Sequence, residues 1–247
     1  MRPQTFTEWL QRRKVFDRDP RLTLRADEVL VKELVAATIG AEHVIPTLWR
    51  GPRLPPRDER TWPRPLALKA SHASGWNHFV RDEREHDWDA IERRVASWMA
   101  QTCGVYTGEW HYRQIVPQLL VEPVVTHVTD LPIDYKFWVF RGKVRCVQVD
   151  LDREHGHKGV MFDAHWRRFD LNHGYPTDVR DIDAPASLPR LFAFAECLAE
   201  DISFVRVDFY EVAGRPLFGE MTFFPEAGYK AFEPGSFDRT FRRWLDA

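Results

Sequence analysis

Two acidic residues, Asp208 and Glu220, are the strongest candidates for chemistry in this sequence. They lie in two runs of alternating apolar and polar residues, 204–210 and 217–223, and a glycine-containing segment joins the runs. This pattern is typical of a β-hairpin. With a three-residue turn at 213–215, Asp208 lies directly opposite Glu220 on one face of the hairpin.

In the same register Val212 pairs with Pro216, and Arg206 lies opposite Thr222. Two carboxylates opposed in this way repel each other unless a cation lies between them. Oxygen ligands on two rigid strands suit Mg²⁺ that also contacts phosphate groups. The alternative is that both carboxylates point to solvent, with a two-residue turn that shifts the register by one.

A lysine at the end of an apolar segment is a second candidate for chemistry. Lys69 ends the expected strand 66–70, and the polar, glycine-containing loop 71–77 follows it. Free backbone N–H groups beside a fixed ammonium can hold polyphosphate oxygens. The segment is no GxxxxGK[ST] phosphate loop. A plain turn beside a solvated lysine is the alternative.

A further hairpin is expected from 134–140 and 143–152, with a turn at 141–143. One of its faces is apolar. The other is polar beside Trp138 and Phe140 and carries Asp134, Lys136, Gln148, Asp150 and Asp152. That face is either the wall of a ligand cleft or an outer, solvated face of the sheet.

The elements that position these residues are helices and antiparallel strands. Helices are expected after Thr5, Asp27, Asp87 and Ser187 and around 237–245, from capping residues and 3.6-residue periodicity. Buried-type strands are expected at 66–70 and 119–125. The proline-rich stretch 51–65 reads as a connection without regular structure. The fold class is therefore α+β.

Composition excludes several classes of function. The formal net charge is −2, from 35 basic and 37 acidic residues, which gives no electrostatic case for a nucleic-acid partner. No run approaches the roughly 18 apolar residues of a membrane span. Three separated cysteines argue against a disulfide framework and fit a reducing compartment, so a cytoplasmic protein is expected. His155 and His157 have no further ligands at zinc spacing.

Taken in order, these segments resemble the ATP-grasp superfamily, and within it the TupA-like (teichuronopeptide biosynthesis) group. The resemblance covers nearly the whole chain and rests on the ordered set of motifs rather than on any one of them. The motifs include Leu68-Lys-Ala-Ser-His-Ala-Ser-Gly-Trp-Asn77, Glu122-Pro123, Asp134-Tyr-Lys-Phe137, Gln148-Val-Asp-Leu-Asp-Arg153, Phe204-Val-Arg-Val-Asp208 and Gly219-Glu-Met-Thr222.

The resemblance implies two lobes with mainly antiparallel sheets that clamp ATP. It implies a reduced N-terminal helical region and linker at 1–62, a first lobe at 63–125 and a second lobe at 126–247. ATP-binding residues in the first lobe would be Lys69, Ser71, Ser74, Gly75, Trp76, Asn77 and the hinge residues Glu122, Val124 and Val125. In the second lobe, Asp134 would approach the ribose.

The same resemblance implies catalytic and metal-binding residues. Catalytic residues would be Lys136, Arg153, Lys158 and Arg206, and one or two Mg²⁺ ions would be held by Asp208, Glu220 and Thr222. Two positions depart from the family pattern. Thr222 stands where many of these enzymes have a metal-binding asparagine, and Ala73 replaces a loop glycine, which restricts the backbone.

The implied reaction is ATP-dependent ligation of a carboxylate to an amine through an acylphosphate, with release of ADP. The substrates would be an amino acid and an acidic saccharide, in the biosynthesis of a cell-surface polysaccharide or peptide conjugate. The alternatives are a kinase that phosphorylates a sugar-like hydroxyl, a polysaccharide glycosyltransferase, or a nucleotide-binding module without catalysis.

Overall fold

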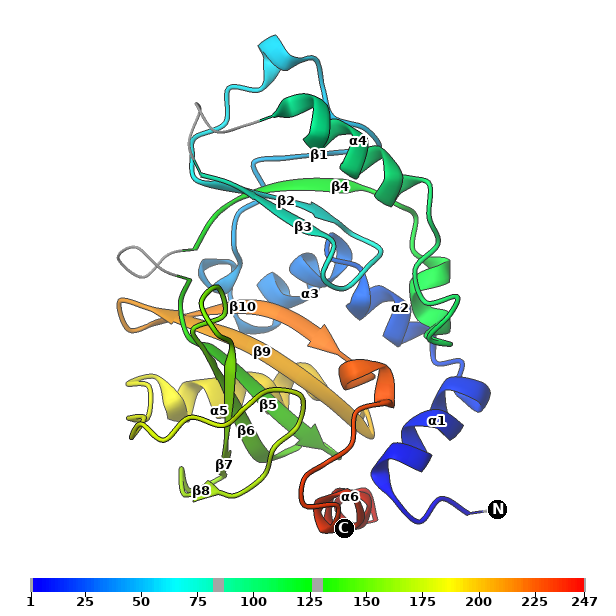
Figure 1. Cartoon of the computed structure of the whole chain (residues 1–247), viewed down its shortest axis with the longest axis vertical. Coiled ribbons are helices and arrows are strands. Elements are labelled where there is room, and N and C mark those ends of the chain that lie inside the picture. Colours follow the sequence, from blue (N-terminus) through cyan, green and yellow to red (C-terminus); the bar gives the residue numbers. More distant parts are fainter. Residues whose placement is uncertain (1, 82–86, 126–130, 247) are drawn as a thin grey trace. The chain divides into compact units, whose positions relative to one another are not determined.

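The computed structural model of the chain describes residues 2–81, 87–125 and 131–246. The chain forms two compact units (Figure 1). The six-stranded unit comprises Met1–Asp17, Val35–His43 and Thr126–Ala247, and the four-stranded unit comprises Arg18–Leu34 and Val44–Val125. All the strand pairings described are antiparallel, so the predicted α+β class is confirmed. Residues of the region expected at 1–62 belong to both units.

The four-stranded unit has the strand order β1-β4-β2-β3. Its strands are β1 (Trp49–Gly51), β2 (Leu66–Ala70), β3 (Asn77–Val80) and β4 (Leu119–Pro123). Its helices are α2 (Pro20–Ala26) and α4 (Trp88–Met99), with short 3₁₀ turns η2 (Arg57–Glu59) and η4 (Trp110–Gln114). Helix α3 (Leu30–Ile39) is divided between the two units.

Helix α4 covers one face of this sheet. Asp87 begins it by accepting a hydrogen bond from the Ala90 N–H at 3.0 Å, as its capping position predicts. Ile91 and Val95 recur on one side of the helix and are buried in a core with Leu68 of β2 and other apolar residues. Since side chains alternate along a strand, Lys69 and Glu122 project from the opposite face of the sheet.

The six-stranded unit has the strand order β10-β9-β5-β6-β7-β8. The strands are β5 (Asp134–Phe140), β6 (Lys143–Leu151), β7 (Lys158–Asp163), β8 (Arg168–Phe169), β9 (Phe204–Val212) and β10 (Arg215–Thr222). The helices are α1 (Phe6–Phe16), α5 (Leu188–Ala199) and α6 (Ser236–Trp244), with 3₁₀ turns η1 (Ala41–His43) and η5 (Pro225–Gly228).

One face of the six-stranded sheet is apolar and packs against α5. Phe137 of β5 lies 5.5 Å, between ring centroids, from Phe192 of α5, and both Phe137 and Leu191 are fully buried. In Figure 1 the helix lies along this side of β5, β6 and β9. Burying such side chains contributes about 1.5–3 kcal/mol each relative to leaving them exposed.

The other face of this sheet is half aromatic and half polar. At its aromatic end Phe6 of α1 packs against Phe204, with ring centroids 4.7 Å apart, and Phe140 packs against Phe241 of α6 at 5.6 Å. The capping box predicted for Thr5 is present and begins α1. The polar end of the same face carries the residues of this unit that are predicted from the sequence to take part in chemistry.

The β9–β10 hairpin differs from its predicted register. The turn has two residues, Ala213 and Gly214, and Val212 pairs with Arg215, not with Pro216. A β-bulge in β10 between 218 and 221 then inserts one extra residue, so Thr222 pairs with Arg206 as predicted. The predicted three-residue turn is therefore wrong, and the bulge restores the predicted pairing at the far end of the hairpin.

The β5–β6 turn also contains two residues, Arg141 and Gly142, rather than the expected three. Several further elements are not predicted by the sequence patterns. Helix α2 begins after Asp19, whose side chain accepts from the Arg21 N–H at 3.0 Å with Pro20 in the first turn. No strand is predicted from the sequence at β1, β3, β7 or β8.

Candidate functional site

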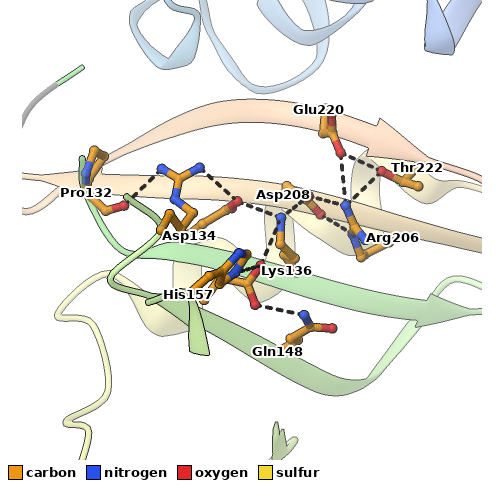
Figure 2. A network of polar contacts seen from close by, with 11 residues as sticks. Pro132, Asp134, Lys136, Gln148, His157, Arg206, Asp208, Glu220 and Thr222 are labelled. Atoms are coloured by element: carbon orange, nitrogen blue, oxygen red, sulfur yellow. Dashed lines mark hydrogen bonds and ion pairs between the residues drawn. The ribbon is translucent and has the colours of Figure 1, made fainter. Parts of the chain in front are cut away.

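Two carboxylates meet at one guanidinium nitrogen at the polar end of the six-stranded sheet (Figure 2). Arg206 Nη2 donates to Asp208 Oδ2 at 2.7 Å and to Glu220 Oε1 at 2.9 Å, and Arg206 Nε donates to Asp208 Oδ1 at 2.8 Å. Thr222 Oγ1 lies 3.0 Å from the same nitrogen and donates to Glu220 Oε1 at 2.8 Å. The prediction that Asp208 and Glu220 share one face of the hairpin is confirmed.

Their common orientation is a consequence of the β-bulge. Phe218 pairs with Phe209 and Met221 with Val207, so the two residues 219 and 220 of β10 lie opposite the single residue Asp208. Without the extra residue, the two-residue turn would direct the Glu220 side chain to the other face of the sheet. The bulge therefore positions Glu220 beside Asp208.

Lys136 of β5 lies at the centre of the polar face. Its Nζ donates to Asp134 Oδ2 at 2.6 Å and to Asp208 Oδ2 at 2.9 Å, and it lies 3.6 Å from Asp150 Oδ2. Lys136, Asp134, Asp150 and Asp208 are each at most 9% exposed. The polar residues of β5 and β6 therefore form a buried ionic network rather than a solvated outer face. Asp152, expected on the same face, follows the end of β6, is exposed and pairs with Arg180.

Asp150 of β6 connects this network to two further side chains. Gln148 Nε2 donates to Asp150 Oδ1 at 2.8 Å, and His157 Nε2 lies 3.1 Å from Asp150 Oδ2. His157 also stacks on Tyr175, with ring centroids 3.5 Å apart. The site residues expected from the sequence do not include His157.

Arg153 and Lys158, both expected near the transferred phosphoryl group, lie in different surroundings. Arg153 Nη1 is 3.4 Å from Asp134 Oδ2, and its guanidinium lies over the Tyr210 ring, so it joins the network. Lys158 Nζ is 3.2 Å from Asp178 Oδ2, and its side chain is 42% exposed. Lys158 thus pairs with a buried carboxylate that does not belong to the network around Lys136.

Burial and charge shift the acid–base properties of the network. Burial raises the pKa of Asp208 to about 6; Arg206 and Lys136 oppose this shift, whereas Asp134 and Glu220 add to it. Burial lowers the pKa of Lys136, but Asp134 and Asp208 outweigh it, so its pKa is raised and the ammonium stays charged. The network therefore holds the charged Lys136 ammonium beside the Asp208 carboxyl group, which is harder to ionise than an ordinary aspartic acid.

The four-stranded unit holds a separate cluster around Glu122 of β4. Lys69 Nζ lies 3.1 Å from Glu28 Oε2 and 3.2 Å from Glu122 Oε2, and Lys32 binds the other Glu122 oxygen. Lys32 Nζ also donates to Ile45 O at 2.8 Å. Burial raises the pKa of Glu122, but the two lysines outweigh it, so the carboxyl has a lowered pKa.

The loop 71–77 follows β2 as expected and leads into the unpredicted strand β3, and its residues differ in how exposed they are. Ser71 is fully buried, and its Oγ accepts from the Gln118 N–H at 3.0 Å. Trp76 packs against the apolar core, whereas Ser74, Gly75 and Asn77 are exposed. The exposed residues are the part of the loop that a ligand can reach.

The expected hinge residues Val124 and Val125 follow β4 and are half-buried. The Val124 N–H donates to Pro65 O at 3.0 Å. That donor is therefore already used within the four-stranded unit, and adenine recognition by this residue would fall to its carbonyl oxygen.

The sequence does contain a signal that identifies His157. The apolar run 160–162 continues the sheet as β7, in which Gly159 pairs with Asp150 and Lys158 with Leu151. A strand at this run places residue 157 beside the polar residues of β6. Zinc-ligand spacing, the test applied to this histidine in the sequence, does not detect such a neighbour.

In the described parts of the chain, no group of three or more His, Cys, Asp or Glu side chains is arranged to hold a metal ion. The donors at the hairpin are two carboxylates and a hydroxyl. This set fits Mg²⁺, which binds through one or two carboxylates and completes its shell with water and phosphate oxygens. Glu220, whose side chain is 37% exposed, leaves room for such ligands.

None of the helices described is long and apolar enough to cross a membrane.

Comparison with solved structures shows which fold this is. D-alanine–D-alanine ligase from Bacillus anthracis is 16% identical with a TM-score of 0.50, and the match covers 81% of this chain and 57% of that one. The same ligase from Helicobacter pylori is 15% identical, with 83% and 56% covered and a TM-score of 0.42. The ATP-grasp ligase PsnB is 11% identical, with 82% and 53% covered and a TM-score of 0.44. The chain spans little more than half the length of these ligases.

No curated protein matches the chain. The model of the TupA-like ATP-grasp family, however, matches residues 8–244, which is nearly the whole sequence. The family predicted from the ordered motifs is confirmed, and the chain belongs to the TupA-like ATP-grasp family.

Proposed function

We propose that this protein is an ATP- and Mg²⁺-dependent ligase that joins a carboxylate to an amine through an acylphosphate. The observation that carries the proposal is the convergence of Asp208 and Glu220 on one point, Arg206 Nη2, within a buried network of further charges. Membership of the ATP-grasp family supports the same reaction class.

We assign magnesium binding to Asp208 and Glu220, with the Thr222 hydroxyl beside them. A bound Mg²⁺ would neutralise phosphate charge during transfer. Asp208 also accepts from Arg206 and Lys136, so it is held in one orientation before any ligand arrives. Arg206 and Lys136 bring positive charge to the same face, where they would stabilise the phosphoryl group in transit.

In the four-stranded unit we assign phosphate binding to Lys69 and to the exposed residues of the loop 71–77. Glu28 and Glu122 hold the Lys69 ammonium, and its side chain is 23% exposed and so open to a ligand. We further propose that 63–125 and 126–247 act as the two lobes of the enzyme, and that Asp134 approaches the ribose.

The reaction needs no protein nucleophile. The carboxylate of the first substrate attacks the γ-phosphorus of ATP, the bond to the β-phosphate oxygen breaks, and ADP leaves. The amine of the second substrate then attacks the acyl carbon, and inorganic phosphate leaves with the electrons of the broken C–O bond. Lys136, Arg153 and Arg206 supply charge stabilisation in the first step. We propose an amino acid and an acidic saccharide, such as a cell-surface polysaccharide precursor, as the substrates.

The test is ADP release from ATP in the presence of single amino acids and uronic acids, with hydroxylamine added as a trap. A ligase gives a hydroxamate together with ADP. ADP release that depends on a sugar hydroxyl, with no hydroxamate, would identify a kinase instead. Binding of a nucleotide sugar with no ADP release would indicate a glycosyltransferase.

A matched pair of variants links the reaction to the hairpin. Asp208→Asn removes a carboxylate of the network and is expected to abolish hydroxamate formation. Asp183→Asn makes the same change at an exposed position of the same unit and is expected to leave it intact. Equal activity in the two variants would exclude Asp208 from the site.

A further inference from the structure

A cavity of about 860 Å³ lies in the four-stranded unit and is lined by residues of helix α4 and of the proline-rich segment 52–60. Leu119 of β4 also lines it, and this residue belongs to the apolar core on the α4 side of the sheet. The cavity is therefore on the face opposite Lys69 and Glu122. Its volume falls within the roughly 300–1,000 Å³ of small-molecule sites.

The surface that α4 and β4 contribute to the cavity is largely apolar. Val95 and Leu119 are buried, and Met99 packs half-buried against the same core. Ala96 and Ala100 are exposed on α4 and end at Cβ, so they leave the space beside the helix open. These five side chains carry no N–H or O–H group and therefore suit the apolar body of a ligand.

The proline-rich segment offers few backbone donors to a ligand. Pro52, Pro55 and Pro56 line the cavity, and proline has no backbone N–H. The Pro55 carbonyl oxygen accepts from Arg60 Nε and Nη2 at 2.9 and 2.8 Å. Arg60 also lies over the ring of Trp88, the first residue of α4, at 4.6 Å from its centroid. The segment is thus held against the helix, which favours a cavity that exists before a ligand binds.

Glu92 is the one acidic side chain among the described residues that line the cavity, and arginines neutralise it. Arg57 Nε donates to Glu92 Oε1 at 3.0 Å and Nη2 to Oε2 at 2.9 Å, and Arg60 Nη1 lies 2.7 Å from Oε1. The hydrogen bonds from Arg57, with a contribution from Arg60, outweigh burial and lower the pKa of Glu92 to about 2. Arg57 also pairs with Asp89, so these four charges balance.

Arg53 is the third arginine of the lining, and it is exposed. In the parts of the chain that the structure describes, Arg53 takes part in no ion pair. A guanidinium presents its N–H groups in a planar fork that matches a carboxylate or a phosphate. Because the other charges are balanced, Arg53 gives the cavity a net positive charge, and the complementary ligand group is an anion.

We propose that this cavity binds an apolar organic anion, which is an aliphatic or aromatic body with one carboxylate or phosphate group. The body lies between the prolines and the alanine-bearing side of α4, and the anionic group pairs with Arg53. The site is separate from the nucleotide site proposed above, because Lys69 projects from the other face of the sheet.

Calorimetric titration of the full chain with octanoate, octyl phosphate and octanol tests the anion. We expect saturable binding of at least one of the two anions, and the tighter one identifies the headgroup. Arg53→Gln should weaken that anion about 10- to 100-fold, the range for one hydrogen bond to a charged group, and octanol less than about threefold. Arg93→Gln is the matched control, because Arg93 is an exposed arginine of α4 outside the lining.

Filling the cavity tests its location. Ala96→Phe and Ala100→Phe each place a large side chain in the space beside α4, and both should abolish binding of all three ligands. Ser97→Phe makes a similar change at an exposed position of α4 outside the lining and should leave binding unchanged. A cooperative thermal unfolding transition shows that each variant is folded.

Three results would overturn the proposal. The first is the absence of saturable binding of either anion to the wild type. The second is unchanged anion binding in folded Ala96→Phe and Ala100→Phe, which would place the ligand elsewhere. The third is an equal loss of anion and octanol affinity in Arg53→Gln, which would show that the arginine does not recognise the anionic group. None of these measurements depends on the ligase reaction.

Discussion

Each unit of the molecule holds a buried carboxylate between two cations, and the two carboxylates behave oppositely. In the four-stranded unit, Lys69 and Lys32 outweigh burial and lower the pKa of Glu122. In the six-stranded unit, burial prevails over Arg206 and Lys136 and raises the pKa of Asp208 to about 6.

The difference lies in the acidic neighbours. The ion pairs described around Glu122 join two lysines, Lys32 and Lys69, to two carboxylates, Glu122 and Glu28. Asp208 is surrounded by further carboxylates, and the network as a whole carries Asp134, Asp150, Asp208 and Glu220 against Lys136, Arg153 and Arg206. The acidic residues around Asp208 disfavour its ionisation and would favour a bound cation, whereas the two lysines favour the ionised form of Glu122.

The largest difference is expected when the central lysine of each cluster is removed. Lys136→Met leaves Asp134, Asp150 and Asp208 without their shared buried cation, and the free energy of unfolding is expected to fall by about 3–5 kcal/mol. Lys69→Met leaves Glu122 paired with Lys32, so about 1.5–3 kcal/mol is expected, the range for one charged hydrogen bond. Urea denaturation of both variants measures this, and equal losses would contradict the comparison.

The two carboxylates should also respond oppositely to pH. The folded state binds the Asp208 proton more tightly than the unfolded chain, whose carboxyl has the ordinary pKa of 3.8. Its contribution to stability is therefore complete below pH 3.8 and lost as the pH rises through about 6. Asp208→Asn lacks this loss, so between pH 4 and 7 its stability relative to wild type should rise, by on the order of 3 kcal/mol.

Glu122→Gln provides the opposing measurement. The folded-state pKa of Glu122 is lowered, so its contribution is present above the ordinary value of 4.5 and is lost as the pH falls through the folded pKa. The variant should be less stable than wild type at pH 7, and the gap should close in acid. Parallel pH dependences in denaturation experiments on the two variants would show that the surroundings of the two carboxylates do not differ as described.

Ligand binding distinguishes a cation site from a structural pair. Mg²⁺ with a non-hydrolysable ATP analogue is expected to stabilise the wild type by about 2.7 kcal/mol at 100 times the dissociation constant. Asp208→Asn should lose most of this gain, whereas its stability without ligand at pH 7 should not fall below that of the wild type. A variant that is less stable alone and still responds fully to the ligand pair would show that Asp208 serves only to pair with Arg206.

The contribution of Lys69 is expected to be specific to the phosphates. Lys69→Ala should weaken ATP binding by about 1.5–3 kcal/mol, one charge-assisted contact, and adenosine binding much less. Calorimetry with both ligands measures this. If the two ligands lose affinity equally, the lysine acts through the fold of its own cluster.

Features that depend on local patterns of residues can be predicted from the sequence. Alternation places Lys136 with Asp134 and Asp150 on one face of β5 and β6, and the capping residues Thr5 and Asp87 begin helices as predicted. Helix α2 escapes prediction because its seven residues are too few for periodicity to show.

Features that depend on packing cannot be predicted in the same way. The alternation of apolar and polar residues predicts which side chains share a face of a strand, but not what packs on that face. It therefore cannot predict that the polar face of β5 and β6 is buried. The shared face of Asp208 and Glu220 is predicted from a turn of the wrong length. The prediction holds because a bulge near Gly219 compensates, and the strict alternation of the sequence conceals such a bulge.

The smallest effect is expected from substitution of Thr222. Its hydroxyl can be compared with the hydroxyl of Ser71 in the four-stranded unit. Thr222 Oγ1 contacts Glu220 and Arg206 and so belongs to the cation site, whereas Ser71 Oγ accepts from a backbone N–H. Thr222→Val should lower the free energy of unfolding by about 1 kcal/mol, the net value of a hydrogen bond. Because the hydroxyl orients Glu220, Mg²⁺ affinity should fall by about fivefold, which corresponds to a similar free energy.

Ser71→Ala removes the hydroxyl that accepts from the part-buried Gln118 N–H and should cost about 0.5–1.5 kcal/mol of unfolding free energy, with Mg²⁺ affinity unchanged. Titrating Mg²⁺ in the presence of the ATP analogue therefore distinguishes the two hydroxyls even though both variants lose stability. A loss of Mg²⁺ affinity far above tenfold in Thr222→Val, restored in Thr222→Asn, would show that residue 222 ligates the metal directly. No change at all in Thr222→Val would separate Thr222 from the cation site and leave Asp208 and Glu220 as its only protein ligands on this hairpin.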